Sequence, residues 1–572
     1  MENYRTQFER WMKSERVPAA LKAELESADD KTLGEFFAGQ MSFGTAGLRA
    51  VMRAGSAFMN VITVAHATQA LALLIKSENA EERGAVVAYD SRNNSEIFAK
   101  TAAGVFAANG IKTYIFDELR PTPLLSFAVR ELGCIVGINI TASHNPKEYN
   151  GYKAYWEDGA QLSPEQARIV AAKMERVDML DGVSECDFEE AVKDGKITVL
   201  GQDFDEKYMA AVLGEIVDKN IIAEQADRLK IVYTPINGAG YRIVPEVLRR
   251  AGIKHLSVVE SQSMPNGDFP TTPNPNPEYP QTFEEGLPVA CKEDAKLIIA
   301  TDPDADRVGV MVRAGDKDEY VCLTGNQVGA LLTDYIITSY EERGCMPDDP
   351  YVVKTIVTSE IISKICKTHG VDLCNVLTGF KFIGEVIKNH EKEGKGSFIF
   401  GFEESYGYLK GTYARDKDSV VASMLICEMA AYYMKKDMTL YDALQDVYRR
   451  YGFYLEGVDS KFYKQPGGTE IMAEKMDALR ANAPKTLAGE KIVRLRDYEA
   501  GTITDLETGN VTPTGLPKSD VLYYETENGN VTVVRPSGTE PKIKFYYLTH
   551  AENKEAAMKI FEGAKADIDA RF

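Results

Sequence analysis

A serine with basic neighbours follows a strand that its sequence predicts to be buried. The apolar run 134–140 predicts the strand, and Ser143 follows it in a turn that Asn145-Pro146 makes sharp. Ligands bind at this end of strands in open α/β sheets. Because His144 and Lys153 lie close in sequence, Ser143 is a candidate nucleophile, whereas a helix cap or backbone hydrogen bond is the structural alternative. No G-x-S-x-G elbow surrounds Ser143, which argues against an α/β-hydrolase.

Three aspartates spaced by two follow another predicted strand, 296–300: Asp302, Asp304 and Asp306. In extended backbone alternate side chains point the same way, so the three carboxylates are expected to converge. Clustered anions repel one another unless a cation lies among them, and hard oxygen ligands favour Mg²⁺ or Ca²⁺. The segment lacks the glycine and glutamate that an EF-hand requires. An acidic surface turn is the alternative to a metal site.

Two later loops carry groups that suit sugars and phosphates. The predicted strand 397–400 leads to Glu403 and Ser405, which also alternate to one side, and a carboxylate with a hydroxyl suits vicinal sugar hydroxyls. An acidic loop with helix-cap roles fits Glu403 and Ser405 equally well. The loop 535–542 offers a guanidinium, two hydroxyls and backbone N–H groups, which match a phosphate, although a hairpin turn would also fit. It is not a Walker A loop.

Two short glycine-containing segments are further candidates. Arg49 follows Gly44-Thr45-Ala46-Gly47 and is able to hold a phosphate through two hydrogen bonds, while a plain turn is the simpler interpretation. The segment 377–381 predicts a glycine turn that carries a lysine.

Strands and helices alternate before the Ser143 loop, which predicts an α/β domain with a largely parallel sheet. Residues 1 to about 40 form a predicted helical extension. The first domain is predicted to contain helices at 61–76 and 95–109 and strands at 84–90 and 111–116. Later predictions are helices at 204–218, 325–339, 359–369 and 552–571, and strands at 230–234, 521–524 and 531–534.

The length of 572 residues predicts several domains. We expect α/β domains at 1–202, 203–322 and 323–452, and a smaller α+β domain at 453–572. In each of the first three, a strand delivers a functional loop, at Ser143, Asp302 and Glu403 respectively. The expected architecture is therefore three similar α/β domains with mixed, largely parallel sheets around a central cleft, which the fourth domain closes.

Composition limits the classes of partner. A formal net charge of −20 disfavours broad binding to nucleic acid or anionic membranes, so any site for an anion must gather positive groups locally. The apolar runs are too short to span a bilayer, and the first residues do not resemble a signal peptide. Since the cysteines lack C-x-x-C spacing, neither a zinc site nor a disulfide framework is predicted, and a reducing cytoplasm fits best.

The segment 141–153 resembles the phosphoserine loop of the α-D-phosphohexomutases, the phosphoglucomutase and phosphomannomutase family. Residues 301–307 closely resemble the magnesium loop of that family. Residues 401–407 resemble its sugar-binding loop, with Glu-x-Ser between glycines, and residues 535–542 resemble its phosphate-binding loop. The resemblance spans residues 44–546, with these motifs in the family's order.

The resemblance implies interconversion of glucose 1-phosphate and glucose 6-phosphate through phosphorylated Ser143, with glucose 1,6-bisphosphate as intermediate and activator. It implies Mg²⁺ bound by Ser143, Asp302, Asp304 and Asp306. The implied catalytic residues are Ser143, His144, Lys153, Arg49 and Lys417. The implied substrate contacts are Arg307, Thr378, Gly379, Lys381, Glu403, Ser405, Arg415, Arg535, Ser537, Gly538, Thr539 and Lys542. The general base is left open among His144, Lys153 and Lys417.

Several alternatives stay open at this point. The segment Tyr155-Trp156-Glu157-Asp158-Gly159 resembles the subgroup that contains both glucose and pentose mutases, and mannose phosphate is also possible. A phosphatase that transfers the phosphoryl group from Ser143 to water is a rival of another class. A non-catalytic sugar-phosphate sensor would be expected to lack Ser143 or one of the three aspartates, and this chain has all of them. Monomer and dimer are equally compatible with the sequence.

Overall fold

The computed structural model describes residues 4–44, 47–315, 319–463, 465, 467–537 and 541–572. The chain forms two compact units. The first comprises Met1–Thr324, Gly384–Gly394 and Tyr406–Thr439. The second comprises Gly325–Ile383, Lys395–Ser405 and Leu440–Phe572.

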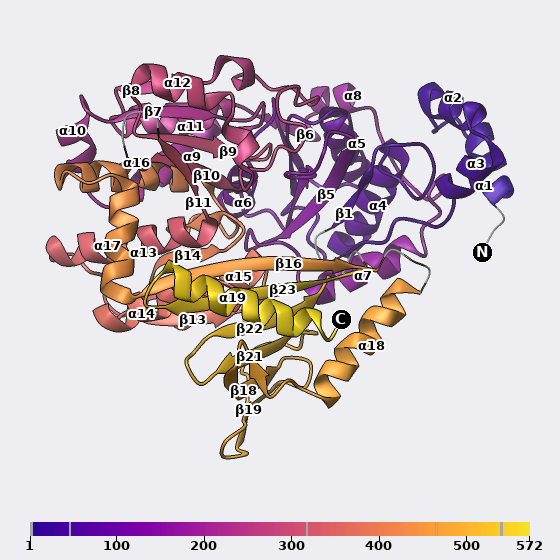
Figure 1. The fold of residues 1–572 in the computed structure, drawn as a ribbon. Helices are drawn as coiled ribbons and strands as arrows, with labels where there is room; N and C mark the ends of the chain where they lie inside the picture. The colour runs from indigo at the N-terminus through magenta and orange to yellow at the C-terminus, as the bar shows by residue number, and fades with distance from the viewer. Residues whose placement is uncertain (1–3, 45–46, 316–318, 464, 466, 538–540) are drawn as a thin grey trace. The chain divides into compact units, whose positions relative to one another are not determined.

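The first unit begins with three helices, as the sequence predicts: α1 (Tyr4–Lys13), α2 (Ala19–Ser27) and α3 (Asp30–Phe36). They bury Trp11, Leu25 and Phe36 in an apolar cluster that also contains Ile62 of α4 and Met179. Asp29 starts α3 as an N-cap, because its carboxylate accepts a hydrogen bond from the Thr32 amide. This part is therefore an ordered addition to the sheet that follows (Figure 1).

A six-stranded sheet follows, in the order β1-β5-β4-β2-β3-β6. Its strands are β1 (Leu48–Val51), β2 (Ala85–Tyr89), β3 (Thr113–Phe116), β4 (Val136–Ile140), β5 (Tyr149–Trp156) and β6 (Ile197–Leu200). The associated helices are α4 (Val61–Ser77), α5 (Ser95–Ala108), α6 (Thr122–Glu131), α7 (Pro164–Met174) and α8 (Phe188–Lys193). β4, β2, β3 and β6 run parallel, while β1 and β5 are antiparallel additions. The helix predicted at 95–109 ends before Gly110, whose φ of 75° suits glycine.

The first unit also contains a five-stranded sheet, in the order β11-β10-β9-β7-β8. Its strands are β7 (Lys230–Thr234), β8 (His255–Val258), β9 (Leu297–Thr301), β10 (Val308–Arg313) and β11 (Tyr320–Leu323). The other elements are α9 (Gln202–Gly214), α10 (Ile221–Gln225), α11 (Gly240–Arg250), η1 (Glu260–Gln262), η2 (Pro280–Phe283), α12 (Gly286–Glu293), β15 (Gly407–Leu409) and α16 (Ser419–Lys435). β9 is buried along its whole length and delivers the acidic loop.

The second unit contains a parallel arrangement of β12 (Pro350–Thr355) between β13 (Asp372–Val376) and β14 (Ser397–Glu403). Its helices here are α13 (Gly325–Glu342), α14 (Ile361–His369), the start of α15 (Phe380–Glu393) and α17 (Leu440–Tyr451).

An eight-stranded antiparallel sheet completes the second unit. Its strands are β16 (Phe453–Phe462), β17 (Thr486–Leu487), β18 (Glu490–Asp497), β19 (Thr502–Asp505), β20 (Val511–Pro513), β21 (Leu522–Thr526), β22 (Val531–Pro536) and β23 (Lys542–Ala551), with helices α18 (Gly468–Ala481) and α19 (Lys554–Asp569). α19 packs along β23 and β16 (Figure 1). The predicted class, three mixed α/β parts and a C-terminal part of strands and helices, is confirmed. The domain boundaries near 202, 322 and 452 stay predictions.

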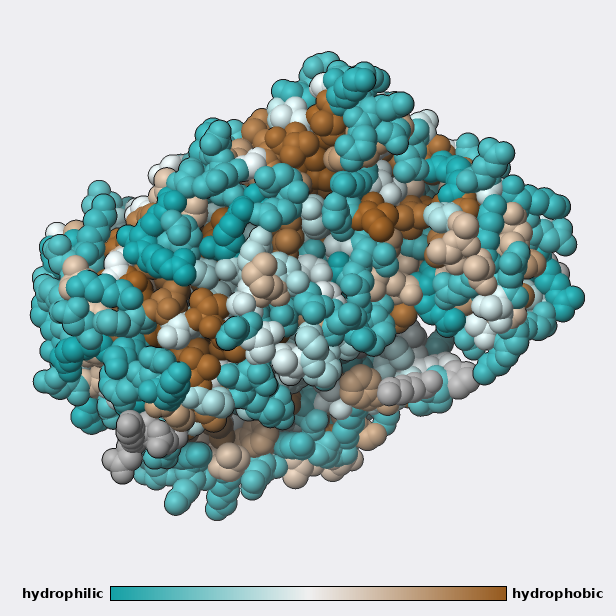
Figure 2. All heavy atoms as spheres, turned by 90° about the horizontal axis from the view of Figure 1, so that it is seen from above, coloured by the Kyte–Doolittle hydropathy of each residue, from teal (hydrophilic) through white to brown (hydrophobic). Residues whose placement is uncertain are grey.

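Among the described residues, no helix is both long enough and apolar enough to cross a membrane. Hydrophilic side chains cover most of the face shown in Figure 2, and hydrophobic ones form separate patches.

Candidate active site

Ser143 lies in a turn after the fully buried strand β4. Its φ of 52° places it in the left-handed region, which is uncommon for a residue with a side chain. The Thr141 hydroxyl accepts a hydrogen bond from the Ser143 amide at 2.8 Å. Ser143 Oγ donates to Asp302 Oδ2 at 2.8 Å and lies 3.3 Å from His144 Nδ1. The structure therefore brings the predicted nucleophile to the predicted acidic loop.

Arg92 holds the Ser143 loop, a role that the sequence did not predict. Its guanidinium donates to the carbonyl oxygens of Ser143 and Asn145 at 2.5 Å each, and to those of Pro146 and Tyr149 at 2.9 and 3.1 Å. Arg92 is buried and forms an ion pair with Asp90 at 3.3 Å. The available signal was its position just after the predicted strand 84–90, which neighbours β4 in the sheet.

The three aspartates converge as predicted, with one carboxylate oxygen of each within 4.8 Å of the other two. The predicted reason was wrong, because Asp302–Asp306 forms a turn in which Ala305 has a φ of 51°, and not an extended segment. The turn directs the amides of Asp306 and Arg307 to Asp302 Oδ1 at 3.1 and 3.0 Å.

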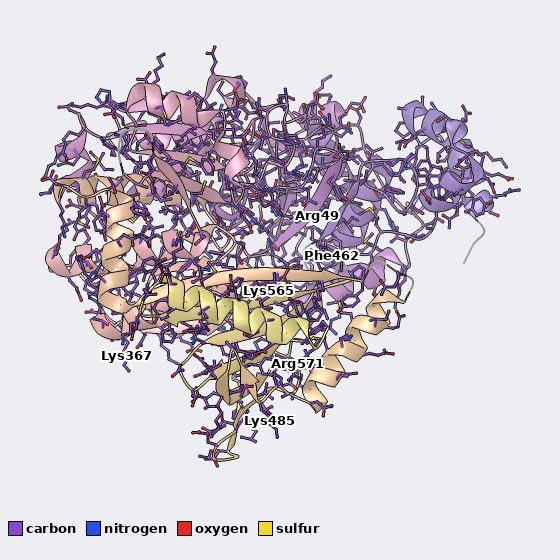
Figure 3. The ribbon with its side chains drawn as sticks, viewed as in Figure 1. Arg49, Lys367, Phe462, Lys485, Lys565 and Arg571 are labelled. Atoms are coloured by element: carbon purple, nitrogen blue, oxygen red, sulfur yellow. The ribbon has the colours of Figure 1, made fainter. Side chains whose placement is uncertain are left out.

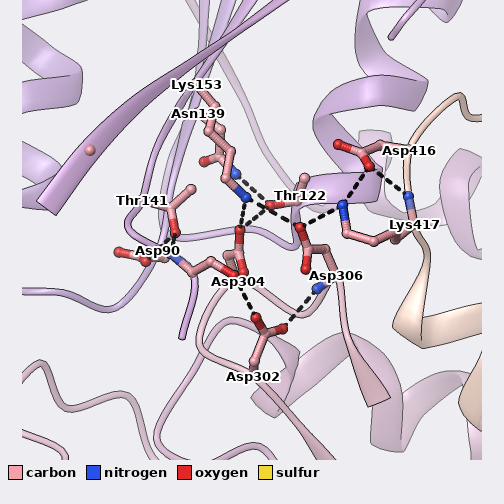
Figure 4. A network of polar contacts seen from close by, with 12 residues as sticks. Asp90, Thr122, Asn139, Thr141, Lys153, Asp302, Asp304, Asp306, Asp416 and Lys417 are labelled. Carbon is pink, nitrogen blue, oxygen red and sulfur yellow. Dashed lines mark hydrogen bonds and ion pairs between the residues drawn. The ribbon is translucent and has the colours of Figure 1, made fainter. Parts of the chain in front are cut away.

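Two lysines face the aspartates (Figure 4). Lys153 Nζ lies 2.7 Å from Asp304 Oδ2 and 3.2 Å from Asp306 Oδ2, and Lys417 Nζ lies 3.2 Å from Asp306 Oδ2. Burial, together with the neighbouring carboxylates, raises the pKa of Asp302 well above its usual value. For Asp304, burial acts in the same direction, but Lys153 outweighs it and lowers the pKa.

The acidic loop fits a hard divalent cation. Asp304 Oδ1 and Asp306 Oδ1 are buried, and neither has a hydrogen-bond partner in the described part of the chain. Arg307 Nε lies 3.9 Å from Asp306 Oδ1, too far for a hydrogen bond. Buried carboxylate oxygens without partners are costly unless something compensates their charge. A cation among them would do so, and oxygen ligands suit Mg²⁺. The residues present therefore fit the metal that the sequence predicts.

Thr122 connects the Ser143 strand to the acidic loop and was not predicted. Its amide donates to the Asp304 carbonyl at 2.8 Å, and its hydroxyl donates to Asp304 Oδ2 at 2.8 Å. Asn139 Nδ2, on β4, donates to the same hydroxyl at 2.6 Å. With Oδ2 occupied by Thr122 and Lys153, Asp304 Oδ1 is the oxygen left for a ligand. No local sequence signal identifies Thr122, because its partners lie far away in the chain.

We expect Thr122→Val to weaken Mg²⁺ binding by roughly 10- to 100-fold, because partners that orient metal ligands have effects of that size. Thr122→Ser should restore binding, since it keeps the hydroxyl. The measurement is the Mg²⁺ concentration that gives a fixed rise in melting temperature, because this concentration increases as binding weakens. Thr333→Val is the matched control, because it removes a buried hydroxyl that donates to the Gly329 carbonyl in the second unit. If Thr122→Val needed the same Mg²⁺ concentration as the wild type for that rise, Thr122 would serve stability alone.

His144, Arg49 and Arg307 are further predicted site residues in the first unit. Burial, with Arg307 and Arg49 nearby, lowers the pKa of His144 well below its usual value, so the ring is neutral at pH 7. Arg49 is exposed and donates to Asn145 Oδ1 at 3.0 Å, within the Ser143 loop. Arg307 lies 2.5 Å from Glu278.

Arg415 is buried inside the first unit. Its guanidinium pairs with Glu391 and donates to the carbonyls of Thr412 and Ala414, and its amide donates to Ser126 Oγ at 2.8 Å. These contacts fix the segment that precedes Lys417. A substrate contact for Arg415 stays a prediction.

The predicted sugar loop belongs to the second unit. Glu403 is the last residue of β14 and is buried, whereas Ser405 lies in the following turn, so the predicted alternation ends at Glu403. The neighbouring Glu404 accepts from the Thr355 hydroxyl at 3.2 Å. Burial, and then Glu403, raises the pKa of Glu404 to about 7.

The remaining predicted contacts also lie in the second unit. Thr378 Oγ1 is buried without a partner among the described residues, Gly379 has a φ of 122°, and Lys381 Nζ lies 5.2 Å from the Phe382 ring centroid. Arg535, on β22, donates to the Tyr546 hydroxyl at 3.4 Å. The Ser537 amide donates to the Lys542 carbonyl at 3.1 Å. Gly538 and Thr539 lie outside the described residues.

Three family models match the chain in order. Residues 40–181 match phosphoglucomutase/phosphomannomutase α/β/α domain I, residues 206–315 match domain II, and residues 324–451 match domain III. A phosphoglucomutase from Staphylococcus saprophyticus is 34% identical over 540 residues, covering 94% of this chain and 95% of that protein.

The chain belongs to the phosphoglucomutase/phosphomannomutase family. A probable phosphoribomutase from Schizosaccharomyces pombe is also 34% identical, over 95% of this chain and 92% of that protein. The solved structure of parafusin, a phosphoglucomutase from Paramecium in its open form, has a TM-score of 0.70 at 16% identity and covers 93% of this chain and 95% of its own. The solved structure of a putative phosphomannomutase from Thermus thermophilus has a TM-score of 0.66 at 22% identity, and it covers 93% of this chain and 99% of its own. These structures confirm the fold, and the named relatives of this family are mutases.

Proposed function

We propose that the protein is a phosphoglucomutase that interconverts glucose 1-phosphate and glucose 6-phosphate. The observation that carries the proposal is the contact of Ser143 Oγ with Asp302, inside a cluster that also contains Lys153 and Lys417. It is supported by relatives named phosphoglucomutase that match nearly the whole chain.

In the proposed reaction, phosphorylated Ser143 gives its phosphoryl group to a substrate hydroxyl. The bond between Ser143 Oγ and phosphorus breaks and a bond from the sugar oxygen to phosphorus forms. The hydroxyl proton leaves through a base, for which His144, Lys153 and Lys417 are the candidates, and a proton returns to Ser143 Oγ. Glucose 1,6-bisphosphate then turns round and returns its other phosphate to Ser143.

Phosphoryl transfer depends mainly on positioning and charge stabilisation. Arg49, Lys153 and Lys417 would supply positive charge, and Arg92 would hold the Ser143 loop. Mg²⁺ held by Asp302, Asp304 and Asp306 would supply charge compensation and act as a Lewis acid. In the second unit, Glu403 and Ser405 would bind sugar hydroxyls, and Arg535 with its loop would bind the phosphate that is not being transferred.

A phosphopentomutase is the second candidate, because the probable phosphoribomutase is as similar as the phosphoglucomutase. A side-by-side assay with the 1-phosphates of glucose, mannose, glucosamine, ribose and deoxyribose, each with trace bisphosphate, tests both. We expect the highest kcat/KM on glucose 1-phosphate. A preference for ribose 1-phosphate would identify a pentose mutase. Release of free phosphate in place of an isomer would contradict both proposals and indicate a phosphatase.

A further inference from the structure

A cleft of about 420 Å³ opens in the second unit between α14 and the eight-stranded sheet. This volume falls within the range of small-molecule sites, about 300–1,000 Å³. One wall includes Lys364 and Lys367 from α14 and Asn375 from β13. The other wall includes Tyr454, Arg496 and Tyr523 from the eight-stranded sheet. Ile356, Val357 and Leu377 pack against Tyr523, Val531 and Val533 in one apolar cluster, which joins the two walls.

Positive charge exceeds negative charge in this cleft. Lys364 and Lys367 are one helical turn apart, both are exposed, and neither forms an ion pair with another described residue. Lys367 projects from the lower end of α14 in Figure 3. In a chain with a net charge of −20, two unneutralised lysines beside a cavity form a local site for an anion.

The carboxylates at the cleft already have cationic partners. Lys354 lies 2.9 Å from Glu360, and Glu525 accepts from Arg494 at 2.8 Å and from Arg496 at 2.9 Å. Arg496 also stacks on Tyr523, with its guanidinium carbon 4.5 Å from the ring centroid. Its Nε is buried without a hydrogen-bond partner among the described residues. Glu456 is close enough to Glu360 to interact with it, but burial raises the pKa of Glu456 to about 7, so its charge is only partial.

We propose that this cleft binds a small organic phosphate, distinct from the substrate at the proposed active site. Lys364 and Lys367 would contact the phosphate oxygens, Arg496 would add a third cation, and the tyrosine rings would cover the organic part.

The cleft is connected to both proposed substrate loops of the second unit. Val531, at its wall, begins β22, and the same strand ends at Arg535 and Pro536. Ile356 and Glu360 follow β12, whose last residue Thr355 contacts Glu404 beside the proposed sugar loop. A ligand that bridges α14 and the sheet would therefore change how the second unit binds sugar phosphate. This regulatory step rests on the proposed function, whereas the binding step does not.

The binding test is mass-spectrometric measurement of amine labelling at each lysine, with inorganic pyrophosphate, a hexose bisphosphate or ATP as the probe. We expect one of these to slow labelling of Lys364 and Lys367 at least about fivefold at millimolar concentration. Stronger protection by ATP or the bisphosphate than by pyrophosphate would support an organic phosphate and show which organic part fits. Protection by pyrophosphate alone would contradict the organic part of the proposal and indicate a simple anion site. Unchanged labelling of both lysines with every probe would overturn the proposal, even if the probes occupy the active site.

The variant Lys364→Glu/Lys367→Glu tests the regulatory step. We expect the effective probe to change the KM for glucose 1-phosphate at least about twofold in the wild type and to leave it unchanged in this variant. Lys554→Glu/Lys559→Glu is the matched control, because it makes the same charge change on exposed lysines of α19. A probe that protects the lysines without changing KM would contradict regulation, while no turnover of any sugar phosphate would contradict the proposed function and leave the labelling result intact.

Discussion

Ser143→Ala is expected to lose nearly all mutase turnover, by at least about a thousandfold, because the proposed phosphoryl carrier is gone. The variant should still fold. It loses one hydrogen bond, from Ser143 Oγ to Asp302, which typically contributes about 1 kcal/mol. Both residues carry a Cβ, so the left-handed backbone is about as strained as before. Intact-mass measurement should find a phosphate on active wild-type protein and none on the variant.

Ser91→Ala is the matched control for Ser143→Ala. Ser91 follows β2 at the neighbouring strand end, and its buried hydroxyl has no hydrogen-bond partner among the described residues. We expect this variant to keep both turnover and the phosphate. Full activity in Ser143→Ala, or an equal loss in both variants, would contradict the assignment of Ser143 as the carrier.

Local patterns predicted the strands and helices because their signals are contained within short segments. The helix predicted at 61–76 is α4, whose N-terminus is fixed by a capping box at Asn60 and Thr63. The apolar run before Ser143 is β4 because strands buried on both faces need continuous apolar sequence. Some boundaries shifted by a few residues, as for α9, which runs from Gln202 to Gly214 and not from 204 to 218.

The candidate site was predicted only where its residues lie within one motif. Asp302, Asp304 and Asp306 were found from their spacing, although a turn and not extended backbone brings them together. Arg92 and Thr122 were missed because their partners, the Ser143 loop carbonyls and Asp304, lie far away in the sequence. The Arg92 contact depends on the neighbouring positions of β2 and β4 in one sheet, whereas the Thr122 contact joins the six-stranded sheet to the loop after β9 of the five-stranded sheet, and no periodicity encodes either.

The second large effect is expected for a substitution among the three aspartates of the proposed Mg²⁺ site. Asp304→Asn keeps the shape of the side chain but removes one negative charge from the three that face the proposed cation. It also gives Lys153 a neutral partner in place of a charged one, because the Lys153 ammonium lies 2.7 Å from the Asp304 carboxylate. Asp268→Asn, at an exposed carboxylate paired with Lys147, is the matched control. We expect Asp304→Asn to reduce Mg²⁺-dependent turnover at least about a hundredfold, since charge compensation at the transferring group is lost.

A binding measurement separates loss of the metal from loss of the fold. In the wild type, Mg²⁺ should raise the melting temperature, because an ion that binds the folded state alone stabilises it by about 2.7 kcal/mol at one hundred times its Kd. Asp304→Asn should largely lose this rise, and chelation followed by added Mg²⁺ should abolish and then restore activity only in the wild type and Asp268→Asn. Because Lys153 would lose much of its charge compensation, the metal-free variant is also expected to melt lower than the metal-free wild type. If Mg²⁺ raised the melting temperature of Asp304→Asn as much as that of the wild type, Asp304 would be excluded as a ligand, even if Asp304→Asn lost activity.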